Sequence, residues 1–378
     1  MIRYYKSTVT ETPDMPPEDD RRLKYGWTTG ACATAAARAA YSALVTGRFP
    51  DPVEILLPKG RRPRFFLADS AMANGGARAA IVKDAGDDPD VTHGAVIEAA
   101  VRQGAPGAGV TFRAGEGVGT VTLPGLPLAV GEPAINPAPR RMMIDNLAEA
   151  RAAHGGFEDV EITISIPNGE AIAKKTWNGR LGIVGGLSIL GTTGIVVPFS
   201  CSAWIHSIHR GIDVARAAHL THIAASTGST SETAVAALYG LPLIALIDMG
   251  DFVGGMLKYL RAHPIPRLSI AGGFGKLSKL AAGHMDLHSK RSQVDPAFLA
   301  RLVERAVGSP GTAAALSVLT SAGAILQRAT TDGIDLGGAV ADAARDQCLR
   351  EADNAFDVEI LVYDRLGRQV GRAGFASP

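Results

Sequence analysis

From about residue 221 onward the sequence alternates short apolar runs with stretches of helical character, and few folds accommodate that rhythm. The apolar runs are THIAAS, LPLIALID and RLSIAG, and helices are predicted between them at 229–239 and 252–262. Strands joined through helices indicate βαβ units and a parallel sheet. We therefore expect a Rossmann-like domain over 201–350.

The same pattern continues toward the C-terminus. Further helices are predicted at about 275–283, 296–307, 311–328 and 335–350. The last segment, 351–378, contains VEILVYDRLGRQVG, whose apolar residues predict an edge strand or hairpin.

The first half of the chain combines two long helices with many short strands. The alanine-rich stretch after Tyr25 predicts a helix that Thr28 or Thr29 caps and Gly47 ends. A second helix is predicted over about 140–153, because the proline-rich stretch before it is expected to be irregular. Each helix is followed by glycine and then by VEI, which favours an internal repeat in which two helices cover one sheet.

These two rhythms predict two domains of different architecture. We expect an N-terminal α+β two-layer sandwich over 23–200 and a C-terminal Rossmann-like parallel-sheet domain over 201–350. The Pro-, Asp- and Glu-rich residues 1–22 are expected to form a disordered lead-in. The stretch LGIVGGLSILGTTGIV at 181–196 precedes the expected domain boundary, and its five glycines favour close approach to another element or to a flat ligand.

Charge and cysteine content narrow the choice of partners. The 378 residues carry a net charge of +1, so we expect no nucleic-acid partner and no membrane surface. No run of 18 apolar residues occurs, which argues against a transmembrane helix. The three cysteines are an odd number without CxxC spacing, which predicts free thiols in a reducing, cytoplasmic location.

The strongest physical signal for a ligand is STGSTSE at 226–232, which follows a predicted strand and begins a predicted helix. Ser229 and Glu232 have the spacing of a capping box, and the small residues expose backbone N–H groups that bind anions or nucleotide oxygens. Asp248 ends the next strand, where a nucleotide-binding βαβ unit places a carboxylate for ribose hydroxyls. A well-capped helix without a ligand is the alternative.

A second glycine-rich turn, IAGGFGKLSK at 270–279, also passes from a strand to a helix. It is not a Walker A loop, because Ile270 replaces the first glycine and Leu277 replaces the Mg²⁺-binding hydroxyl residue. ATP is therefore not expected. Lys276 is a candidate ligand for a carboxylate or phosphate, or else a solvated surface lysine.

The stretch KDAGDDPDVTHG at 83–94 gathers four aspartates within seven residues, followed by His93. Clustered carboxylates repel one another unless a cation or hydrogen bonds stabilise them, so this cluster is a candidate site. An Asx-type turn is the alternative. The histidine pairs elsewhere in the chain lack completing thiolates or carboxylates, and we expect no metal site.

Seven blocks carry a more specific signal when they are taken together. In chain order they are YGWTTGACATAAARAA, VKDAGDDPDVTHG, GEPAINPAPRRM, IPNGEAIAKKTWNGRLGIVGGLSILGTTGIV, STGSTSE, MGDFVGGMLK and GGFGKLSKLAAG. In this order, from about Leu23 to Ser289, the chain resembles the CbiD-type cobalt-precorrin-5B methyltransferases of cobalamin biosynthesis. The family's usual Thr-His-Ser is Leu287-His288-Ser289 here.

The resemblance implies an α+β domain followed by a Rossmann-like one. It also implies transfer of a methyl group from S-adenosylmethionine to ring carbon 1 of a cobalt-containing tetrapyrrole. Because that substrate carries several carboxylate arms, scattered lysines and arginines suit it better than one basic patch. A general base is optional, since the reduced macrocycle is itself the nucleophile.

The candidate site residues fall into three groups. The expected S-adenosylmethionine-binding residues are Ser226, Thr227, Gly228, Ser229, Thr230, Glu232, Asp248, Gly250, Asp251, Gly272, Gly273, Gly275 and Lys276. The expected tetrapyrrole-binding residues are Thr28, Thr29, Gly30, Lys59, Asn136, Arg140, Lys174, Thr192 and Thr193. The catalytic candidates are His93, His288 and Asp87, among which the sequence makes no choice.

Two other function classes stay open at this point. An NAD(P)H-dependent precorrin oxidoreductase would use the Rossmann-like half, although the GxGxxG fingerprint is absent. A non-enzymatic tetrapyrrole-binding protein would use the glycine-rich cleft without a cofactor. In every case the expected partner is a small molecule, and assembly into a homo-oligomer is left open.

Overall fold

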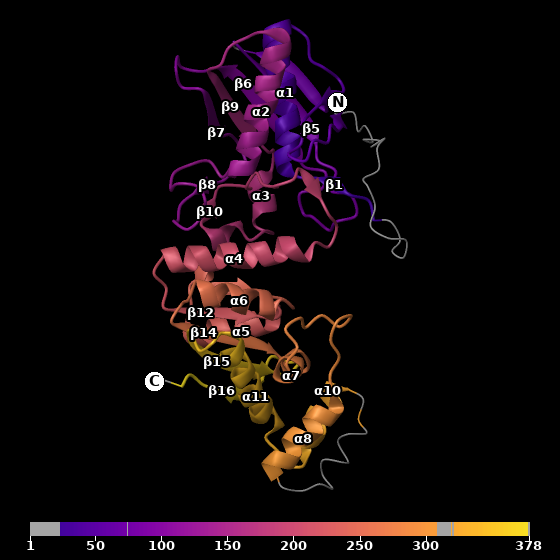
Figure 1. The fold of residues 1–378 in the computed structure, drawn as a ribbon, viewed down its shortest axis with the longest axis vertical. Helices are drawn as coiled ribbons and strands as arrows, with labels where there is room; N and C mark the ends of the chain where they lie inside the picture. The colour runs from indigo at the N-terminus through magenta and orange to yellow at the C-terminus, as the bar shows by residue number, and fades with distance from the viewer. Residues whose placement is uncertain (1–22, 74, 308–318, 320, 377–378) are drawn as a thin grey trace. The chain divides into compact units, whose positions relative to one another are not determined.

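The computed structural model describes residues 23–73, 75–307, 319 and 321–376, and the chain divides into two compact units (Figure 1). Unit 1 is Met1–Ser200 and unit 2 is Cys201–Pro378. The lead-in expected over 1–22 lies outside the described residues. Both units mix α-helices and β-sheets, so the chain is a mixed α/β protein.

Unit 1 is built on a five-stranded sheet with the strand order β4-β5-β6-β9-β7. All neighbouring pairs are antiparallel except β7 and β9, which are parallel. The strands are β4 (Asp69–Ala73), β5 (Gly76–Val82), β6 (Val96–Gln103), β7 (Val110–Ala114) and β9 (Val160–Ser165).

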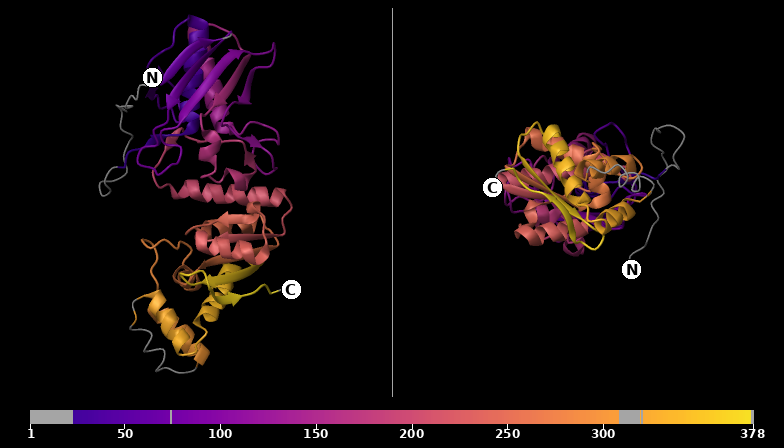
Figure 2. Two further views of the ribbon diagram at one scale, coloured as in Figure 1. Left: turned by 180° about the vertical axis from the view of Figure 1, so that it is seen from behind. Right: turned by 90° about the horizontal axis from the view of Figure 1, so that it is seen from below.

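Two helices, α1 (Thr29–Thr46) and α2 (Pro137–His154), lie along one face of this sheet (Figure 1). The view from behind shows the opposite face without helices (Figure 2). That face carries ion pairs, such as those of Arg102 and Arg113 with Glu161. Along β9, Val160, Ile162 and Ile164 instead point into the core beneath the helices.

Helix α1 packs against α2 and against the strands β5 and β6. Its many alanines allow this close packing on two sides. Small side chains let the helix backbone approach two neighbours at once. The Thr28 side chain accepts a hydrogen bond from the Ala31 N–H, and Gly47 ends the helix with φ +74°. Both predicted ends of this helix are therefore confirmed.

The predicted start of the second helix is wrong by three residues. Helix α2 begins at Pro137, not at Arg140, because proline needs no hydrogen-bond partner in the first helical turn.

The predicted internal repeat is also wrong, because its two strands belong to different sheets. The VEI after α1 gives β2 (Val53–Glu54), which pairs with β3 (Arg64–Phe65) in a separate sheet, whereas the VEI after α2 gives β9 of the main sheet.

A set of short elements lies beside the N-terminal ends of α1 and α2 (Figure 1). Two antiparallel ribbons belong to it, one pairing β1 with β11 and one pairing β8 with β10. The elements are β1 (Gly26–Trp27), β8 (Thr120–Val121), α3 (Gly169–Ala173), a 3₁₀ turn (Asn178–Leu181), β10 (Ile183–Val184) and β11 (Ile195–Val196). The glycine-rich stretch 181–196 therefore folds wholly within unit 1.

Unit 2 contains a second five-stranded sheet with the order β13-β12-β14-β15-β16. The first four strands are parallel, and β16 is antiparallel to β15. The strands are β12 (His222–Ser226), β13 (Leu246–Asp248), β14 (Arg267–Gly273), β15 (Asp357–Tyr363) and β16 (Gln369–Ala373). The C-terminal pair is a hairpin whose first strand lies inside the sheet and whose second strand forms its edge.

Most helices of unit 2 lie close to their predicted ranges. They are α5 (Ser229–Tyr239), α6 (Val253–Ala262), α7 (Phe274–Ala281), α8 (Pro296–Val307), α10 (Ala322–Thr331) and α11 (Leu336–Glu351), with a 3₁₀ turn at Leu243–Ala245. Half of the helix expected over 311–328 lies outside the described residues, and α10 begins at Ala322. One helix was not predicted at all, namely α4 (Cys201–Ala217).

No helix in the described part of the chain combines the length and apolarity needed to cross a bilayer. All three cysteines are free. Cys32 and Cys348 are buried and Cys201 is exposed. Burial raises the pKa of the Cys32 thiol to about 12, so this side chain acts as a small apolar filler of α1.

Candidate functional site

The sheet of unit 2 contains a point at which the strand order reverses. The chain passes from β12 to β13 on one side and then crosses back to β14 on the other side of β12. In open α/β sheets, ligands bind outside the carboxyl ends of the strands at such a point. Here those ends carry Thr227 and Gly228 after β12, and Gly272 and Gly273 at the end of β14.

Hydrogen bonds tie the three loops at this edge together. The Thr227 N–H donates to Ala271 O at 3.0 Å, which joins the loops after β12 and β14. The N–H groups of Met249 and Gly250 donate to Ser226 O at 3.0 and 3.1 Å, which joins the loop after β13. The candidate residues after all three strands are thus brought together at one edge of the sheet.

Lys276 links two loops at this edge of the sheet. Its ammonium donates to Thr227 O at 2.7 Å and lies 3.0 Å from the Asp251 carboxylate. The Lys276 side chain is 38% exposed, so it borders solvent while it links two loops. A lysine in this position fixes the loop geometry and offers positive charge at the mouth of the crevice.

The capping box predicted for Ser229 and Glu232 is wrong. Gly228 is the N-cap of α5 and Ser229 is already helical, so the N-cap residue has no side chain that could accept a backbone N–H. The Ser231 hydroxyl donates to Gly228 O. Backbone N–H groups at a helix start can bind an anion or a polar ligand oxygen.

Space and an unused hydroxyl accompany these N–H groups. A Cβ atom added at Gly228 or Gly273 would meet nothing within 4 Å. Ser226, 1% exposed at the end of β12, has a side-chain oxygen without a hydrogen-bond partner. Asp248 is its register partner on β13 and ends that strand. A buried hydroxyl and an aspartate thus occupy paired positions at the ends of these two strands.

His288 also belongs to this edge. The Leu287 N–H donates to Asp251 O at 2.9 Å, so the segment containing His288 lies against the loop after β13. The His288 side chain is exposed, and its Nδ1 accepts the Lys290 N–H at 3.2 Å. This bond places the ring proton on Nε2. The other two catalytic candidates, His93 and Asp87, are in unit 1.

The tetrapyrrole-binding candidates of unit 1 gather where α1 and α2 begin. The Thr29 hydroxyl donates to Leu190 O and accepts the Leu190 N–H, and the Gly30 N–H donates to the same carbonyl. The Thr28 N–H donates to Gly194 O, and the Asn136 N–H donates to Ile189 O. The segment 187–196 therefore binds both helix N-termini through its backbone.

Several glycines at this junction are required by packing. A Cβ at Gly30 would lie 2.8 Å from a Pro139 side-chain atom and 2.9 Å from Leu190 O. Gly191 has φ +118°, and a Cβ there would lie 2.3 Å from the Thr28 side chain. Thr192 is exposed beside them, while the Thr193 hydroxyl bonds to its own strand at Ile195 O.

Of the remaining basic candidates, Arg140 lies in the first turn of α2, whereas Lys59 and Lys174 lie elsewhere in unit 1. Lys59 is exposed in the turn between β2 and β3, and Lys174 follows α3. Arg140 is held by its neighbours, because its guanidinium donates to Ile135 O and pairs with Glu132 at 3.0 Å.

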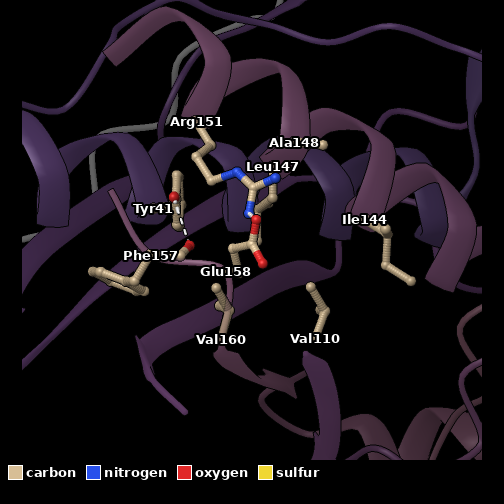
Figure 3. A pocket seen from close by; sticks show the side chains of 9 residues that line it. All are labelled: Tyr41, Val110, Ile144, Leu147, Ala148, Arg151, Phe157, Glu158 and Val160. Carbon is tan, nitrogen blue, oxygen red and sulfur yellow. Dashed lines mark hydrogen bonds and ion pairs between the residues drawn. The ribbon is translucent and has the colours of Figure 1, made fainter. Parts of the chain in front are cut away.

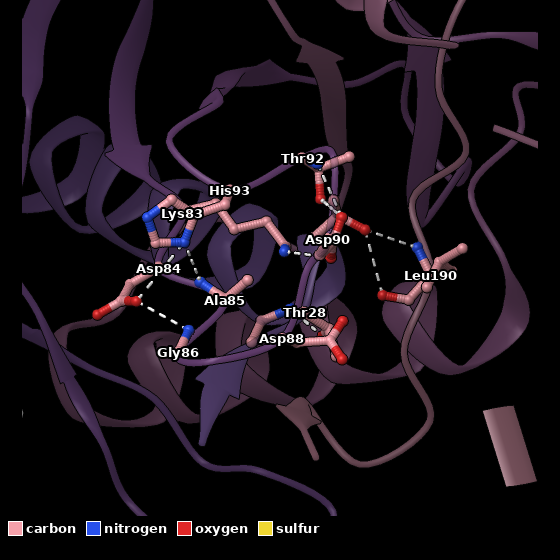
Figure 4. A network of polar contacts seen from close by, with 12 residues as sticks. Thr28, Lys83, Asp84, Ala85, Gly86, Asp88, Asp90, Thr92, His93 and Leu190 are labelled. Atoms are coloured by element: carbon pink, nitrogen blue, oxygen red, sulfur yellow. Dashed lines mark hydrogen bonds and ion pairs between the residues drawn. The ribbon is translucent and has the colours of Figure 1, made fainter. Parts of the chain in front are cut away.

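The acidic loop at 84–93 is stabilised by partners within unit 1 (Figure 4). Asp84 pairs with Lys24 at 2.5 Å, Asp87 accepts the Lys24 N–H, and Asp88 accepts the Phe199 N–H. Among the described residues, no three His, Cys, Asp or Glu side chains converge as a metal site would need. The loop is held by hydrogen bonds and ion pairs, as an Asx-type turn would be.

Asp90 and Lys83 form the most buried ion pair of this loop. Their charged atoms lie 2.6 Å apart, and the Lys83 side chain is 1% exposed. Burial alone would raise the pKa of Asp90, but the Lys83 ammonium and the Thr92 hydrogen bonds outweigh it and hold that pKa below its usual value. His93 accepts the Ala85 N–H at its Nδ1, which fixes its ring orientation.

A separate pocket of unit 1 lies toward the C-terminal ends of α1 and α2 (Figure 3). The Tyr41 hydroxyl donates to Phe157 O there, and Arg151 pairs with Glu158. None of the candidate residues lines it; the lining is Tyr41, Val110, Ile144, Leu147, Ala148, Arg151, Phe157, Glu158 and Val160.

Comparison with known proteins places these features in a family. The family model described as CbiD matches residues 16–198, and the model described as CbiD, C-terminal domain matches residues 286–374. A relative from Paramagnetospirillum magneticum is 60% identical over 356 residues, which is 94% of this chain and 99% of that protein. A relative from Brucella abortus (strain S19) is 58% identical over 362 residues, 96% of this chain and 98% of that protein.

Both relatives carry the name cobalt-precorrin-5B C(1)-methyltransferase. A crystal structure of a cobalamin biosynthesis protein (cbiD) from Archaeoglobus fulgidus is 24% identical, with a TM-score of 0.38. It covers 82% of this chain and 85% of that one.

The parallel sheet with its reversal point, and the loops tied together at its carboxyl edge, define an α/β enzyme of two units. The chain belongs to the CbiD family and is a methyltransferase. The resemblance drawn from the seven sequence blocks is thereby confirmed.

Proposed function

We propose that this chain transfers a methyl group from S-adenosylmethionine to ring carbon 1 of cobalt-precorrin-5B in cobalamin biosynthesis. The observation that carries the proposal is the 60% identity, across 94% of the chain, to a protein named for that reaction. At this similarity over nearly the full length of both chains, a change of reaction class would be exceptional. No feature of the described residues favours the oxidoreductase or the non-enzymatic alternative.

We further propose that unit 2 is a Rossmann-like domain that binds the methyl donor at the carboxyl edge of its sheet. The unpartnered Ser226 hydroxyl and the open space at Gly228 and Gly273 fit a ligand with hydroxyl and carboxylate groups. The first turn of α5, whose N-cap is the glycine Gly228, would supply N–H donors. Asp248 would accept the ribose hydroxyls, in keeping with its place at the end of β13.

Once bound, the donor supplies an electrophilic methyl group on a sulfonium. The task of the protein is then alignment of donor and acceptor, because methyl transfer is an in-line displacement. Lys276 holds the loops after β12 and β13 at a fixed separation through Thr227 O and Asp251. The segment that carries His288 lies against the loop after β13, because the Leu287 N–H donates to Asp251 O, and we propose His288 as the catalytic candidate of this edge.

We propose that unit 1 is an α+β two-layer sandwich and that it binds the substrate. Thr28, Thr29 and Asn136 lie where the starts of α1 and α2 meet the segment 187–196, and their bonds to that segment hold this proposed binding surface in shape. Thr192 adds an exposed hydroxyl. His93 and Asp87, in the acidic loop, are proposed to contact the substrate from that loop.

Binding calorimetry tests the donor site. We expect S-adenosylmethionine and S-adenosylhomocysteine to bind the full-length protein and NADPH not to bind. Gly228→Val should weaken S-adenosylhomocysteine binding by about tenfold or more, because its side chain would enter the open mouth of the crevice. The Gly228 backbone is extended at φ 168°, so the variant should keep its stability.

Gly374→Val is the matched control, since a Cβ there also meets open space in the same unit. It should bind the adenosyl ligand as the unmodified protein does. Full affinity in Gly228→Val would refute this placement of the donor, whereas failure of the unmodified protein to bind either adenosyl ligand, with or without corrinoid, would refute the function itself.

A further inference from the structure

We infer that Trp204 stacks on the adenine ring of the methyl donor, an inference that rests on the proposed function and extends it to a residue of α4. Trp204 lies in the first turn of α4, in unit 2. Its indole N–H donates to Asp248 O at 3.1 Å. This bond joins the indole directly to the residue proposed to hold the ribose.

The indole of Trp204 is fixed by its N–H while part of the residue stays exposed. A tryptophan offers a large apolar ring surface and a single N–H donor that seeks a partner. Here the N–H donates to the backbone carbonyl of Asp248, and the residue is 42% exposed. An exposed ring that is fixed by its N–H offers a flat apolar surface without the cost of ordering it on binding.

Two further contacts hold the ring at the carboxyl edge of the sheet. Ring atoms of Trp204 lie 3.4–3.5 Å from the position that a Cβ would take at Gly250. Phe252 lies on another side, with ring centroids 6.4 Å apart and planes inclined by 51°. The indole is therefore wedged over the loop after β13, beside Asp248.

Adenine is the part of the donor that this surface fits. In the proposed pose the ribose hydroxyls meet the Asp248 carboxylate, and adenine is bonded to that same ribose. Adenine would then lie next to Asp248, whose backbone carbonyl accepts the Trp204 N–H. Stacking of a nucleobase on an aromatic side chain is tolerant of small shifts and is worth measurable affinity.

The test uses the intrinsic fluorescence of the full-length protein. The chain has three tryptophans, so the Trp27→Phe/Trp177→Phe variant retains Trp204 as its only indole. We expect S-adenosylhomocysteine to quench that fluorescence and homocysteine, which lacks adenine, to leave it unchanged. Quenching by a corrinoid alone, with none by S-adenosylhomocysteine, would assign the surface to the substrate and overturn the inference.

Calorimetry with Trp204 variants gives the energetic readout. Trp204→Ala should weaken S-adenosylhomocysteine binding by about tenfold, and Trp204→Phe, which keeps a flat ring, by about threefold or less. If the adenosyl ligand binds the unmodified protein, while Trp204→Ala keeps full affinity and the single-tryptophan protein shows no quenching, the stacking inference fails alone. If the unmodified protein binds no adenosyl ligand, the inference falls together with the proposed function.

Discussion

At the scale of single residues, the Lys83–Asp90 pair shows how a buried ion pair helps to hold the acidic loop. Lys83 is almost fully buried, and a buried ammonium is costly unless a carboxylate lies against it. Asp90 also accepts the N–H and the hydroxyl of Thr92. One member of the aspartate cluster, Asp90, thus serves as the counter-charge of Lys83, which directly follows β5.

Asp90→Asn should lower the free energy of unfolding at pH 7 by about 3 kcal/mol, because it leaves the Lys83 charge buried and unpaired. Lys83→Met/Asp90→Asn should recover most of that loss, since a methionine of similar shape needs no counter-charge. Urea unfolding of the two variants and the unmodified protein measures both effects. Equal destabilisation by the single and the double variant would contradict this account of the pair.

The same pair predicts the sign of a pH effect. The pKa of Asp90 is lowered in the folded state, so the unfolded chain binds more protons in acid. The stabilisation is complete above the ordinary aspartate pKa of about 3.9 and is lost as the pH falls through the lower folded value. Asp90→Asn should therefore show a shallower loss of stability below pH 4 than the unmodified protein.

At the scale of elements, the stretch 181–196 separates two reasons for having glycine. Gly186 crosses Gly117 so closely that an added Cβ would lie 2.2 Å from the Gly117 carbonyl oxygen. Gly185 has φ +87°, yet a Cβ there meets nothing within 4 Å. One glycine is required by contact with another backbone, and its neighbour by its own backbone conformation.

Gly186→Ala should therefore cost about 3 kcal/mol of stability, because two backbone segments must move apart. Gly185→Ala should cost only about 1 kcal/mol, the ordinary strain of a left-handed alanine. Thermal or urea unfolding of this matched pair separates the two causes. Similar losses from both substitutions would show that the close approach to Gly117 is not the controlling constraint.

The helices that the sequence predicted correctly are those with marked ends. Thr28 and Gly47 define α1 through their side-chain and backbone chemistry, and both act as expected. Helix α4 escaped prediction because Trp204, Ile205 and Gly211 have lower helix propensity than alanine or leucine. The spacing of Ile205, Ile208 and Ile212 nevertheless carries the helical period that would have revealed it.

The capping box at Ser229 and Glu232 failed for a different reason. Its residue spacing was right, but Gly228 adopts the extended conformation of the N-cap and moves the helix start by one residue. Sequence spacing cannot distinguish two adjacent N-caps when both residues are small and polar or glycine. The N-cap of α5 is therefore a glycine, which has no side chain to accept a backbone N–H.

At the scale of the whole molecule, residues of the candidate sites could be predicted only as far as chain order implies proximity. The loops after β12, β13 and β14 meet because parallel strands end at one edge of the sheet. Their proximity therefore follows from the strands that the sequence predicts. The role of Trp204 depends on a bond from α4 to Asp248, 44 residues away, and no local pattern announces it. Lys83 and Asp90 likewise pair by tertiary placement.

The division into two units predicts that unit 2 can bind the methyl donor by itself. Every proposed donor-binding residue, from Trp204 to Lys276, lies in unit 2, and that unit has its own sheet and its own core of residues such as Ala224, Val235 and Leu361. A fragment comprising Cys201–Pro378 should therefore fold cooperatively and bind S-adenosylhomocysteine with an affinity within about tenfold of the full-length protein.

Circular dichroism establishes whether each fragment folds, and calorimetry measures binding. The Met1–Ser200 fragment is the control and should fold around α1 and its five-stranded sheet without binding the adenosyl ligand. A folded Cys201–Pro378 fragment that does not bind would show that unit 1 supplies donor contacts. In that case the reversal point between β12 and β14 would not be a sufficient donor site, although the family membership of the chain would stand.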